Sequence, residues 1–350
     1  MSASSHTLNN FNLLRLLFAL FVVAYHLVVL SGVQEWRIAE GPLSLLAEIG
    51  VQGFFVLSGY LVYASLERST SLGLYAEKRF RRLYPAYAVV VVACAAAGIA
   101  FSAEARANPG AVGEYLGWNL VFANFMAPEL PGVFQANTIH EVNGALWTLK
   151  IELMFYLVLP ILGWLIRVAG PARWLIIVLA YVGAEAWRIV LTSMGQAELA
   201  RQLPGQMSFF ITGMALYLLP LSGSRLHIAG LAGAVLLATS LVLDIAEPLR
   251  AIGLGFLAVW IAIGWPRLPD AARLGDLSYG AYIVHFPIIQ TIVALGLFAA
   301  PWTGASAALA ATLVAALLLW HLVERPALRR DSAYRTGQLP DIDASGGRVP

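Results

Sequence analysis

The chain contains 350 residues, of which 59% are hydrophobic and 12% are charged. Charged residues make up about a quarter of a typical soluble domain, so this composition indicates an integral membrane protein and excludes a soluble Rossmann or barrel enzyme. Basic and acidic residues nearly balance at a formal net charge of +2. This near balance by itself says nothing about nucleic acid. For a membrane protein we expect the lipid bilayer as a partner, and no nucleic acid.

Apolar runs long enough to cross the hydrocarbon core occur along most of the chain. They predict an all-α, polytopic membrane protein with ten transmembrane helices, at residues 13–31, 47–66, 85–101, 146–168, 174–191, 207–220, 228–243, 249–265, 277–298 and 303–322. The apolar segment 112–126 is shorter and interrupted by polar residues. We expect it to be re-entrant or to lie at the outer interface.

The distribution of basic residues predicts the orientation of these helices. Residues 68–82 form the densest basic segment between expected spans, and the positive-inside rule places it in the cytoplasm. With ten alternating helices, most of the Lys and Arg residues then fall on the cytoplasmic side, and so do both termini. We expect residues 1–325 to form the transmembrane domain and residues 326–350 a short, disordered cytoplasmic tail.

Two ionisable residues, Arg15 and His26, fall in the first expected helix. Their spacing places them on one face of an α-helix, about 16 Å apart along its axis. Arg15 could also be an anchor at the cytoplasmic interface, and His26 could make a hydrogen bond between helices. Because histidine accepts a proton near neutral pH, we interpret His26 as a general base.

A carboxylate, Glu152, lies near the outer end of the fourth expected helix. The topology brings both Glu152 and His26 into the outer half of the membrane. We therefore expect the two side chains to meet, so that Glu152 orients the imidazole. The alternative is an interfacial pair with Lys150, although residues two apart on a helix face different ways.

Three further side chains are candidates for supporting roles around this pair: Trp147, Tyr156 and His285. Near His285, the ring of Pro287 frees a backbone carbonyl close to Ile283, so that a structural role in a kinked helix and a catalytic role are both open. No pair of histidines or carboxylates has the spacing of metal ligands, and we expect no metal.

The basic segment also contains Arg79 and Arg82, three residues apart. Such clusters usually determine topology or attract anionic lipid. The functional alternative is a phosphate site, because the forked guanidinium donors of arginine suit phosphate groups.

Five segments, in this order along the chain, carry a resemblance to a known family. They are Arg15 with His26, the sequence GVQGFFVLSGY at 50–60, RFRRLYPAY at 79–87, LWTLKIE at 146–152 with the Phe-Tyr pair that follows, and YGAYIVHFP at 279–287. Together with the expected topology, they resemble the acyltransferase-3 family of integral membrane transacylases. That family O-acylates glycans and other extracytoplasmic acceptors with acyl-CoA from the cytoplasm.

The resemblance implies a role for each matching residue. His26 resembles the essential histidine of the family and Arg15 its partner arginine, while Arg79 and Arg82 resemble the Arg-x-x-Arg pair that handles the CoA phosphates. Glu152 resembles the acid of the fourth-helix motif. One departure is Lys150, at a place where the family more often has a small residue.

The resemblance therefore implies an enzyme of the bacterial inner membrane. It would move an acyl group, most simply acetyl, from acyl-CoA to a hydroxyl of a glycan or glycoside, either directly or through an acyl group on His26. A proton-coupled exporter is the rival interpretation, because a histidine and a glutamate in mid-membrane could also form a proton relay. Acyl-CoA is the expected donor, and the oligomeric state is not predicted.

Overall fold

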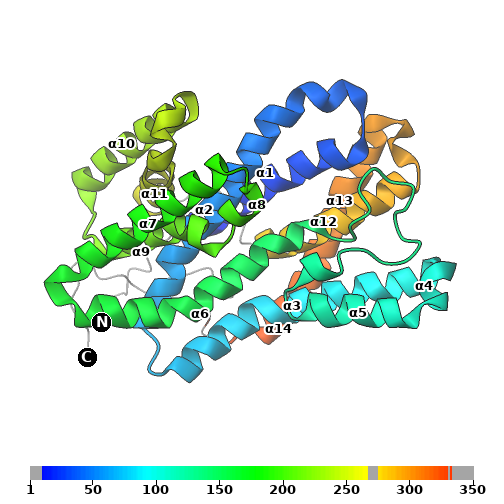
Figure 1. The fold of residues 1–350 in the computed structure, drawn as a ribbon, viewed down its shortest axis with the longest axis horizontal. Helices are drawn as coiled ribbons and strands as arrows, with labels where there is room; N and C mark the ends of the chain where they lie inside the picture. The colour runs from blue at the N-terminus through cyan, green and yellow to red at the C-terminus, as the bar shows by residue number, and fades with distance from the viewer. Residues whose placement is uncertain (1–9, 267–274, 330–331, 333–350) are drawn as a thin grey trace.

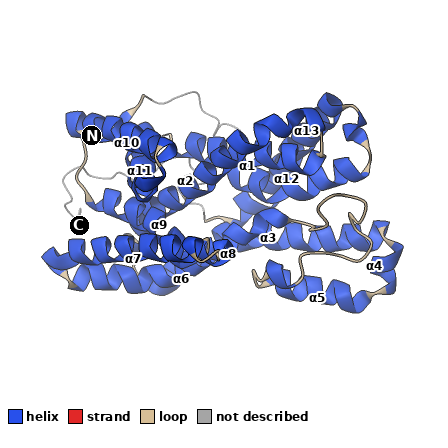
Figure 2. Cartoon of the chain, turned by 45° about the horizontal axis from the view of Figure 1, so that its top comes forward, coloured by secondary structure: helices blue, strands red, loops and turns tan. Residues whose placement is uncertain are grey.

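The computed structural model describes residues 10–266, 275–329 and 332. Over these residues the chain is helical, and no strand occurs among them (Figure 2). The long helices are α1 (Phe11–Ser31), α2 (Glu40–Glu67), α3 (Leu72–Phe101), α6 (Trp147–Val168), α7 (Arg173–Ser193), α9 (Leu203–Leu218), α10 (Gly223–Val242), α11 (Arg250–Val259), α12 (Leu277–Ala294) and α13 (Pro301–Leu319). The prediction of an all-α protein is confirmed.

Short helical pieces join or extend these helices. The α-helical ones are α4 (Ala103–Ala107), α5 (Pro109–Leu120), α8 (Ala197–Ala200) and α14 (Arg325–Ala327), and the others include η1 (Gln34–Ala39), η5 (Asp244–Leu249), and the π-helical turns η6 (Trp260–Gly264) and η9 (Trp320–Glu324). The turn η9 continues α13 directly into α14. The expected tail lies outside the described residues from residue 330 onward, apart from Ser332.

Within the described residues, nine helical segments are long and apolar enough to cross a membrane. Each of the ten expected helices has a counterpart, but α9 has 16 residues and is not among these nine. The protein is therefore a multi-pass membrane protein, while the count of ten and the cytoplasmic placement of both termini stay predictions. Exposed apolar residues cover helices such as α7, where Val178, Leu179 and Val182 are all exposed, as expected for a surface that faces lipid.

The segment around residues 112–126 forms α5, which has 12 residues and is about 18 Å long at 1.5 Å per residue. It is too short to cross the bilayer. It packs beside α3 (Figure 1), where the hydroxyl of Tyr87 donates to the carbonyl of Asn119 at 2.6 Å. The length of α5 argues against an eleventh crossing, and a re-entrant position and a position at the outer interface both stay predictions.

Helix α3 begins earlier than expected, at Leu72 rather than at residue 85. The side chain of Ser71 accepts from the backbone N–H of Leu74 and caps the helix, and Pro85 lies inside it. The basic residues of segment 68–82 were expected in a loop because they interrupt the apolar run. Most of them instead form the first turns of α3.

The centre of the bundle is formed by α1, α2, α9 and α12, and α12 is the most deeply buried of the spanning candidates. Close packing of α2 on α9 depends on glycine. A Cβ atom at Gly59 would lie 2.1 Å from the carbonyl oxygen of Phe210, and one at Gly213 would lie 2.1 Å from that of Val56. Small residues let helix backbones approach in a membrane, and here they let α2 pack closely on α9.

Candidate active site

The imidazoles of His26 and His285 lie side by side. Helix α1 packs against α12, and Nδ1 of His26 lies 2.8 Å from Nε2 of His285. The rings are nearly parallel, with centroids 5.0 Å apart. His285 is fully buried and His26 is half-buried. The structure therefore gives His26 a histidine as its polar partner.

A side chain replaces the hydrogen-bond donor that helix α12 loses at Pro287. Because Pro287 has no N–H, the carbonyl of Ile283 lacks its helical donor. The amide Nδ2 of Asn143 donates to that carbonyl at 2.8 Å. In the same helix, Nδ1 of His285 lies 3.1 Å from the carbonyl oxygen of Ala281. His285 is thus anchored on a helix whose irregular turn has its own partner.

The expected meeting of His26 and Glu152, both within the described residues, does not occur. Glu152 instead accepts hydrogen bonds from the hydroxyls of Ser58, at 3.2 Å, and of Tyr156. The reason lies in the packing, because α1 contacts α2 and α12 whereas α6 contacts α2, α7 and α9. The alternative pair of Glu152 with Lys150 is also wrong, since the ammonium of Lys150 lies 4.5 Å from the centre of the Phe125 ring.

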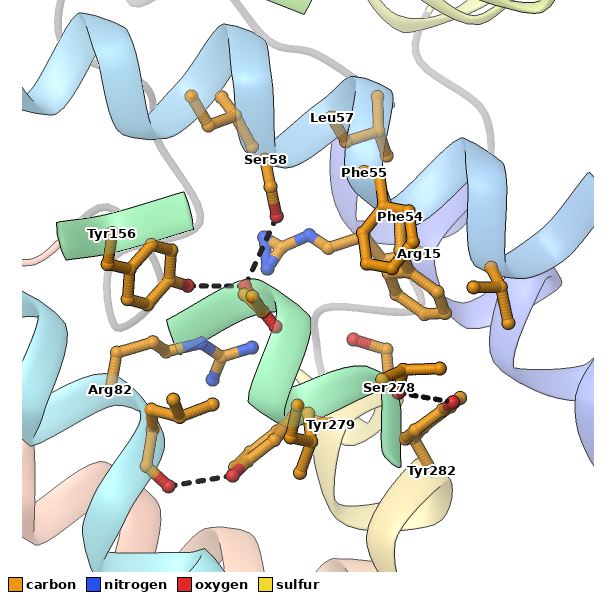
Figure 3. A pocket seen from close by; sticks show the side chains of 16 residues that line it. Arg15, Phe54, Phe55, Leu57, Ser58, Arg82, Tyr156, Ser278, Tyr279 and Tyr282 are labelled. Carbon is orange, nitrogen blue, oxygen red and sulfur yellow. Dashed lines mark hydrogen bonds between the residues drawn. The ribbon is translucent and has the colours of Figure 1, made fainter. Parts of the chain in front are cut away.

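A pocket lies between α1, α2, α3, α6 and α12 (Figure 3). Its polar lining consists of Arg15, Ser58, Arg82, Thr148, Glu152, Tyr156, Ser278, Tyr279 and Tyr282. At one end are the two arginines. At the other end the hydroxyls of Tyr282 and Thr148 lie 2.7 Å apart, and the ring of Tyr282 is 6.0 Å from that of His285. His26 and His285 do not line the pocket themselves, and Tyr282 is the lining residue that contacts the histidine pair.

The arginine end of the pocket is a buried cluster of ion pairs. Asp276 Oδ2 lies 2.8 Å from Nη1 of Arg15 and 2.8 Å from Nη2 of Arg82. The other terminal nitrogen of Arg82, Nη1, lies 3.0 Å from Oε2 of Glu324. One guanidinium thus joins two carboxylates from different helices, and one carboxylate joins two arginines.

The electrostatics of Asp276 follow from this arrangement. Burial by itself favours the neutral acid and would raise the pKa of Asp276, but the adjacent guanidinium groups of Arg15 and Arg82, with a hydrogen bond from Ser278, outweigh it and hold the pKa below its ordinary value. Asp276 is therefore ionised at neutral pH, and it holds both arginines of the pocket lining.

A comparison with known families shows to which family the chain belongs. The family model described as an acyltransferase domain matches residues 8–321, nearly the whole chain. The chain belongs to the acyltransferase-3 family. The resemblance drawn from the five sequence segments is confirmed, and the protein is a membrane-bound O-acyltransferase.

Several known proteins are similar in sequence to most of this chain. Nodulation protein 10 of Rhizobium leguminosarum bv. viciae is 29% identical, over 93% of this chain and 95% of its own length. An O-acetyl transferase of Shigella phage Sf6 is 25% identical, over 93% of this chain and 98% of its own. The peptidoglycan O-acetyltransferase OatA of Listeria monocytogenes is 28% identical over 89% of this chain and 54% of its own length. No solved structure matches the chain.

Both arginines of the Arg-x-x-Arg pair of this acyltransferase turn into the bundle. Arg79 is buried, donates from Nη2 to the hydroxyl of Ser65 at 3.2 Å, and lies over the ring of Tyr156 at 5.7 Å from its centre. Arg82 lies over the ring of Tyr279 at 5.2 Å. Residues three apart share a helix face, so both guanidinium groups border the region around Glu152 and the pocket.

Of the supporting candidates, Tyr156 and His285 contact the expected site residues, through Glu152 and His26 respectively. Trp147 begins α6 and is half-buried against the hydrophobic core. The functional roles of all these residues stay predictions.

Two acidic residues of the acyltransferase were missed by reasoning from the sequence. Asp276 and Glu324 stand immediately before and after the run 277–323, which contains no Asp, Glu, Lys or Arg. That run was used only to predict two membrane crossings. Carboxylates at the ends of two adjacent antiparallel crossings on the same side of the membrane lie near each other, and this signal could have identified them as partners for Arg15 and Arg82.

Proposed function

We propose that this acyltransferase takes an acyl group, most simply acetyl, from acyl-CoA on the cytoplasmic side of a bacterial inner membrane and transfers it to a hydroxyl of a glycan or glycoside on the other side. The names of two relatives support the reaction, because one is an O-acetyl transferase and the other a peptidoglycan O-acetyltransferase. The positive-inside orientation, which places the arginine end of the pocket toward the cytoplasm, supports the direction.

The observation that carries the proposal is the path of polar side chains through the bundle. It runs from Arg15 and Arg82 through the pocket to the hydroxyls of Thr148 and Tyr282, and from there to His285 and His26. The head group of a CoA thioester is highly charged and its pantetheine arm is long and narrow. A pocket with cations at one end and a base beyond the other suits such a donor.

His26 is the base in this proposal. The proton of the acceptor hydroxyl passes to the imidazole of His26 while the hydroxyl oxygen attacks the carbonyl carbon of the thioester. The carbon–sulfur bond then breaks, and the leaving thiolate takes the proton back from His26 to give free CoA. General base catalysis of this kind is worth about 10² to 10⁴ in rate.

In this proposal Arg79 and Arg82 bind the phosphates of the donor, and Arg15 lies beside Arg82 in the pocket lining. Arg82 already binds Asp276 and Glu324, so a phosphate at its guanidinium group competes with these two carboxylates. Arg79 makes a hydrogen bond to a neutral hydroxyl, that of Ser65. We therefore expect both arginines to contribute to donor affinity.

The proton-coupled exporter stays the alternative to this proposal. It depended on a relay between His26 and Glu152, and Glu152 instead binds Ser58 and Tyr156. Measurement of acyl-CoA consumption separates the two functions, because an exporter moves protons without consuming a thioester.

The test is release of free thiol from acetyl-CoA by the purified protein in detergent, with a soluble glycoside as acceptor. We expect acceptor-dependent release that falls at least about a hundredfold in His26→Ala. The matched control is His227→Ala, because His227 is exposed on α10 and bonds to Trp260. Near-normal turnover by His26→Ala, or proton flux without thiol release, would overturn the proposal.

Donor binding is tested by Arg79→Lys, which preserves the charge but removes the guanidinium fork. If Arg79 grips phosphate through that fork, the apparent KM for acetyl-CoA should rise by the equivalent of about 1 to 3 kcal/mol. Arg81→Lys is the control, since Arg81 is exposed and pairs with Glu77. An unchanged KM for Arg79→Lys would move the donor site elsewhere.

A further inference from the structure

The hydrogen-bond partners of His285 determine where its ring proton lies. Nδ1 of His285 is 3.1 Å from the carbonyl oxygen of Ala281. A carbonyl oxygen can only accept a hydrogen bond, so Nδ1 must carry the proton. In the neutral ring, Nε2 of His285 is then left with a lone pair and can only accept.

The same reasoning extends to His26. Its Nδ1 faces Nε2 of His285 at 2.8 Å, and because that nitrogen is an acceptor, Nδ1 of His26 must donate. The neutral ring of His26 therefore carries its proton on Nδ1 and has its lone pair on Nε2. The hydrogen bond made by one ring nitrogen thus sets the chemistry of the other.

We propose that His285 is a positioning residue that holds His26 as the Nδ1–H tautomer, so that Nε2 of His26 is the nitrogen that takes the proton of the acceptor hydroxyl. The proposal deepens the function proposed above and rests on it for the role of His26 as the base. When Nε2 takes a proton, both nitrogens of His26 carry hydrogen, and Nδ1–H continues to donate to His285.

Neighbouring groups fix both rings in this arrangement. The ring of Phe286 meets that of His26 edge-on, with centroids 5.1 Å apart. The ring of Tyr25 also contacts that of His26, with centroids 5.3 Å apart. His285 is held by the backbone of α12 and is fully buried. Its partner is therefore set by the packing of α1 on α12 rather than by a mobile side chain.

The membrane gives a physical reason for a histidine in this role. In soluble hydrolases a buried carboxylate commonly orients the catalytic histidine. An ionised carboxylate within a membrane-spanning helix costs several kcal/mol unless it is paired. Neutral His285 supplies the same acceptor without a buried charge, and the carboxylate of Glu152 is bound elsewhere.

The molecule contains an internal reference of the opposite kind. Nε1–H of Trp260 donates to Nδ1 of His227 at 2.9 Å. Nδ1 of His227 therefore accepts, and the neutral ring carries its proton on Nε2. Within the described residues, His26 and His285 should thus show one tautomer and His227 the other.

The experiment is ¹⁵N NMR of the purified full-length protein labelled at histidine, at a pH where the imidazoles are neutral. Signals are assigned by their loss in His26→Ala, His285→Ala and His227→Ala. We expect a protonated Nδ1 and an unprotonated Nε2 for both His26 and His285, and the reverse for His227. A protonated Nε2 on His26 in the wild-type protein would overturn the proposal.

Kinetics provide the second readout. His285→Ala should lower kcat by about 10² or more, as expected for a base held in the wrong tautomer, while the KM for acetyl-CoA stays unchanged. His285→Gln retains an acceptor oxygen and should recover part of the lost kcat. Unaltered kcat and tautomer in His285→Ala would contradict the proposal, and if that variant does not fold, the wild-type spectrum and His285→Gln still decide.

The two proposals fail in different ways. The tautomer of His26 is measured without substrate, so it can be as expected even if no acyl transfer occurs, and in that case the proposed function is wrong. If acyl transfer depends on His26 but the spectrum shows Nε2–H, the role of His285 is wrong and the proposed function stands.

Discussion

Replacement of Arg82 by lysine isolates the energetic contribution of the forked guanidinium in the pocket lining. Arg82 contacts Glu324 through Nη1 at 3.0 Å and Asp276 through Nη2 at 2.8 Å. Lysine preserves the positive charge, but its single ammonium cannot reproduce two contacts in the plane of a fork. Arg82→Lys therefore loses one of the two contacts, either that to Glu324 or that to Asp276, which also pairs with Arg15.

The size of the effect follows from burial. The side chain of Arg82 is 9% exposed and those of Asp276 and Glu324 are 1% and 2% exposed, so water does not replace the lost contact. Loss of one charge-assisted hydrogen bond at such a site costs about 1.5 to 3 kcal/mol. The adjacent Arg81 is 44% exposed and its partner Glu77 is 39% exposed, and such a pair contributes about 0 to 1 kcal/mol.

The assay is the free energy of unfolding of the purified protein in mixed detergent micelles, titrated with a denaturing detergent and followed by circular dichroism. Arg82→Lys should be less stable than the wild-type protein by about 1.5 to 3 kcal/mol, and Arg81→Lys should differ from it by less than about 1 kcal/mol. Equal stability of the two variants would refute the conclusion that Arg82 is bound by two buried carboxylates.

Three further predictions concern the same fold. The pKa of Asp276 is lowered in the folded protein, so its charge contributes fully to stability above the ordinary pKa of 3.8, and this contribution is lost as the pH falls from 3.8 through the lower folded value. The stability difference between the wild-type protein and Asp276→Asn should therefore begin to shrink near pH 3.8, and a difference that is constant down to strong acid would contradict this. Gly59→Ala should destabilise by about 1 to 3 kcal/mol because its Cβ meets the backbone of α9, whereas Gly183→Ala, in open space, should be neutral or stabilising by up to about 1 kcal/mol; equal thermal midpoints would refute the close approach. A cysteine at position 40 should react with a membrane-impermeant reagent from outside intact cells and one at position 71 should not; labelling at Ser71 would reverse the expected orientation.

Much of the fold follows from hydropathy, because every helix that crosses a membrane needs about 20 predominantly apolar residues. The boundaries followed less well. Helix α3 extends into the basic segment 68–82, since Arg79 and Arg82 are buried in the bundle and do not mark a loop. Local hydropathy cannot distinguish a solvated arginine from one that is neutralised by carboxylates elsewhere in the chain.

The candidate site shows the same limit. Helical spacing correctly placed Arg15 and His26 on a face of α1 that points to polar partners, but it does not reveal which helix lies opposite that face. His26 meets His285 rather than Glu152 because α12, and not α6, packs against α1. The pairing of remote helices is tertiary information, and the periodicity of a single helix does not contain it.

The most direct test of the proposed function uses proteoliposomes with acetyl-CoA and acceptor on opposite sides of the membrane. The protein is reconstituted in one orientation. Acetyl-CoA with a labelled acetyl group is supplied on the face that carries Ser71, and a membrane-impermeant glycoside is supplied on the opposite face. The label should appear on the glycoside, with equal release of free CoA on the donor side, and His26→Ala should abolish both. Transfer only when donor and acceptor share one side, or label on the glycoside that is independent of His26, would contradict transfer of the acyl group across the membrane through this site.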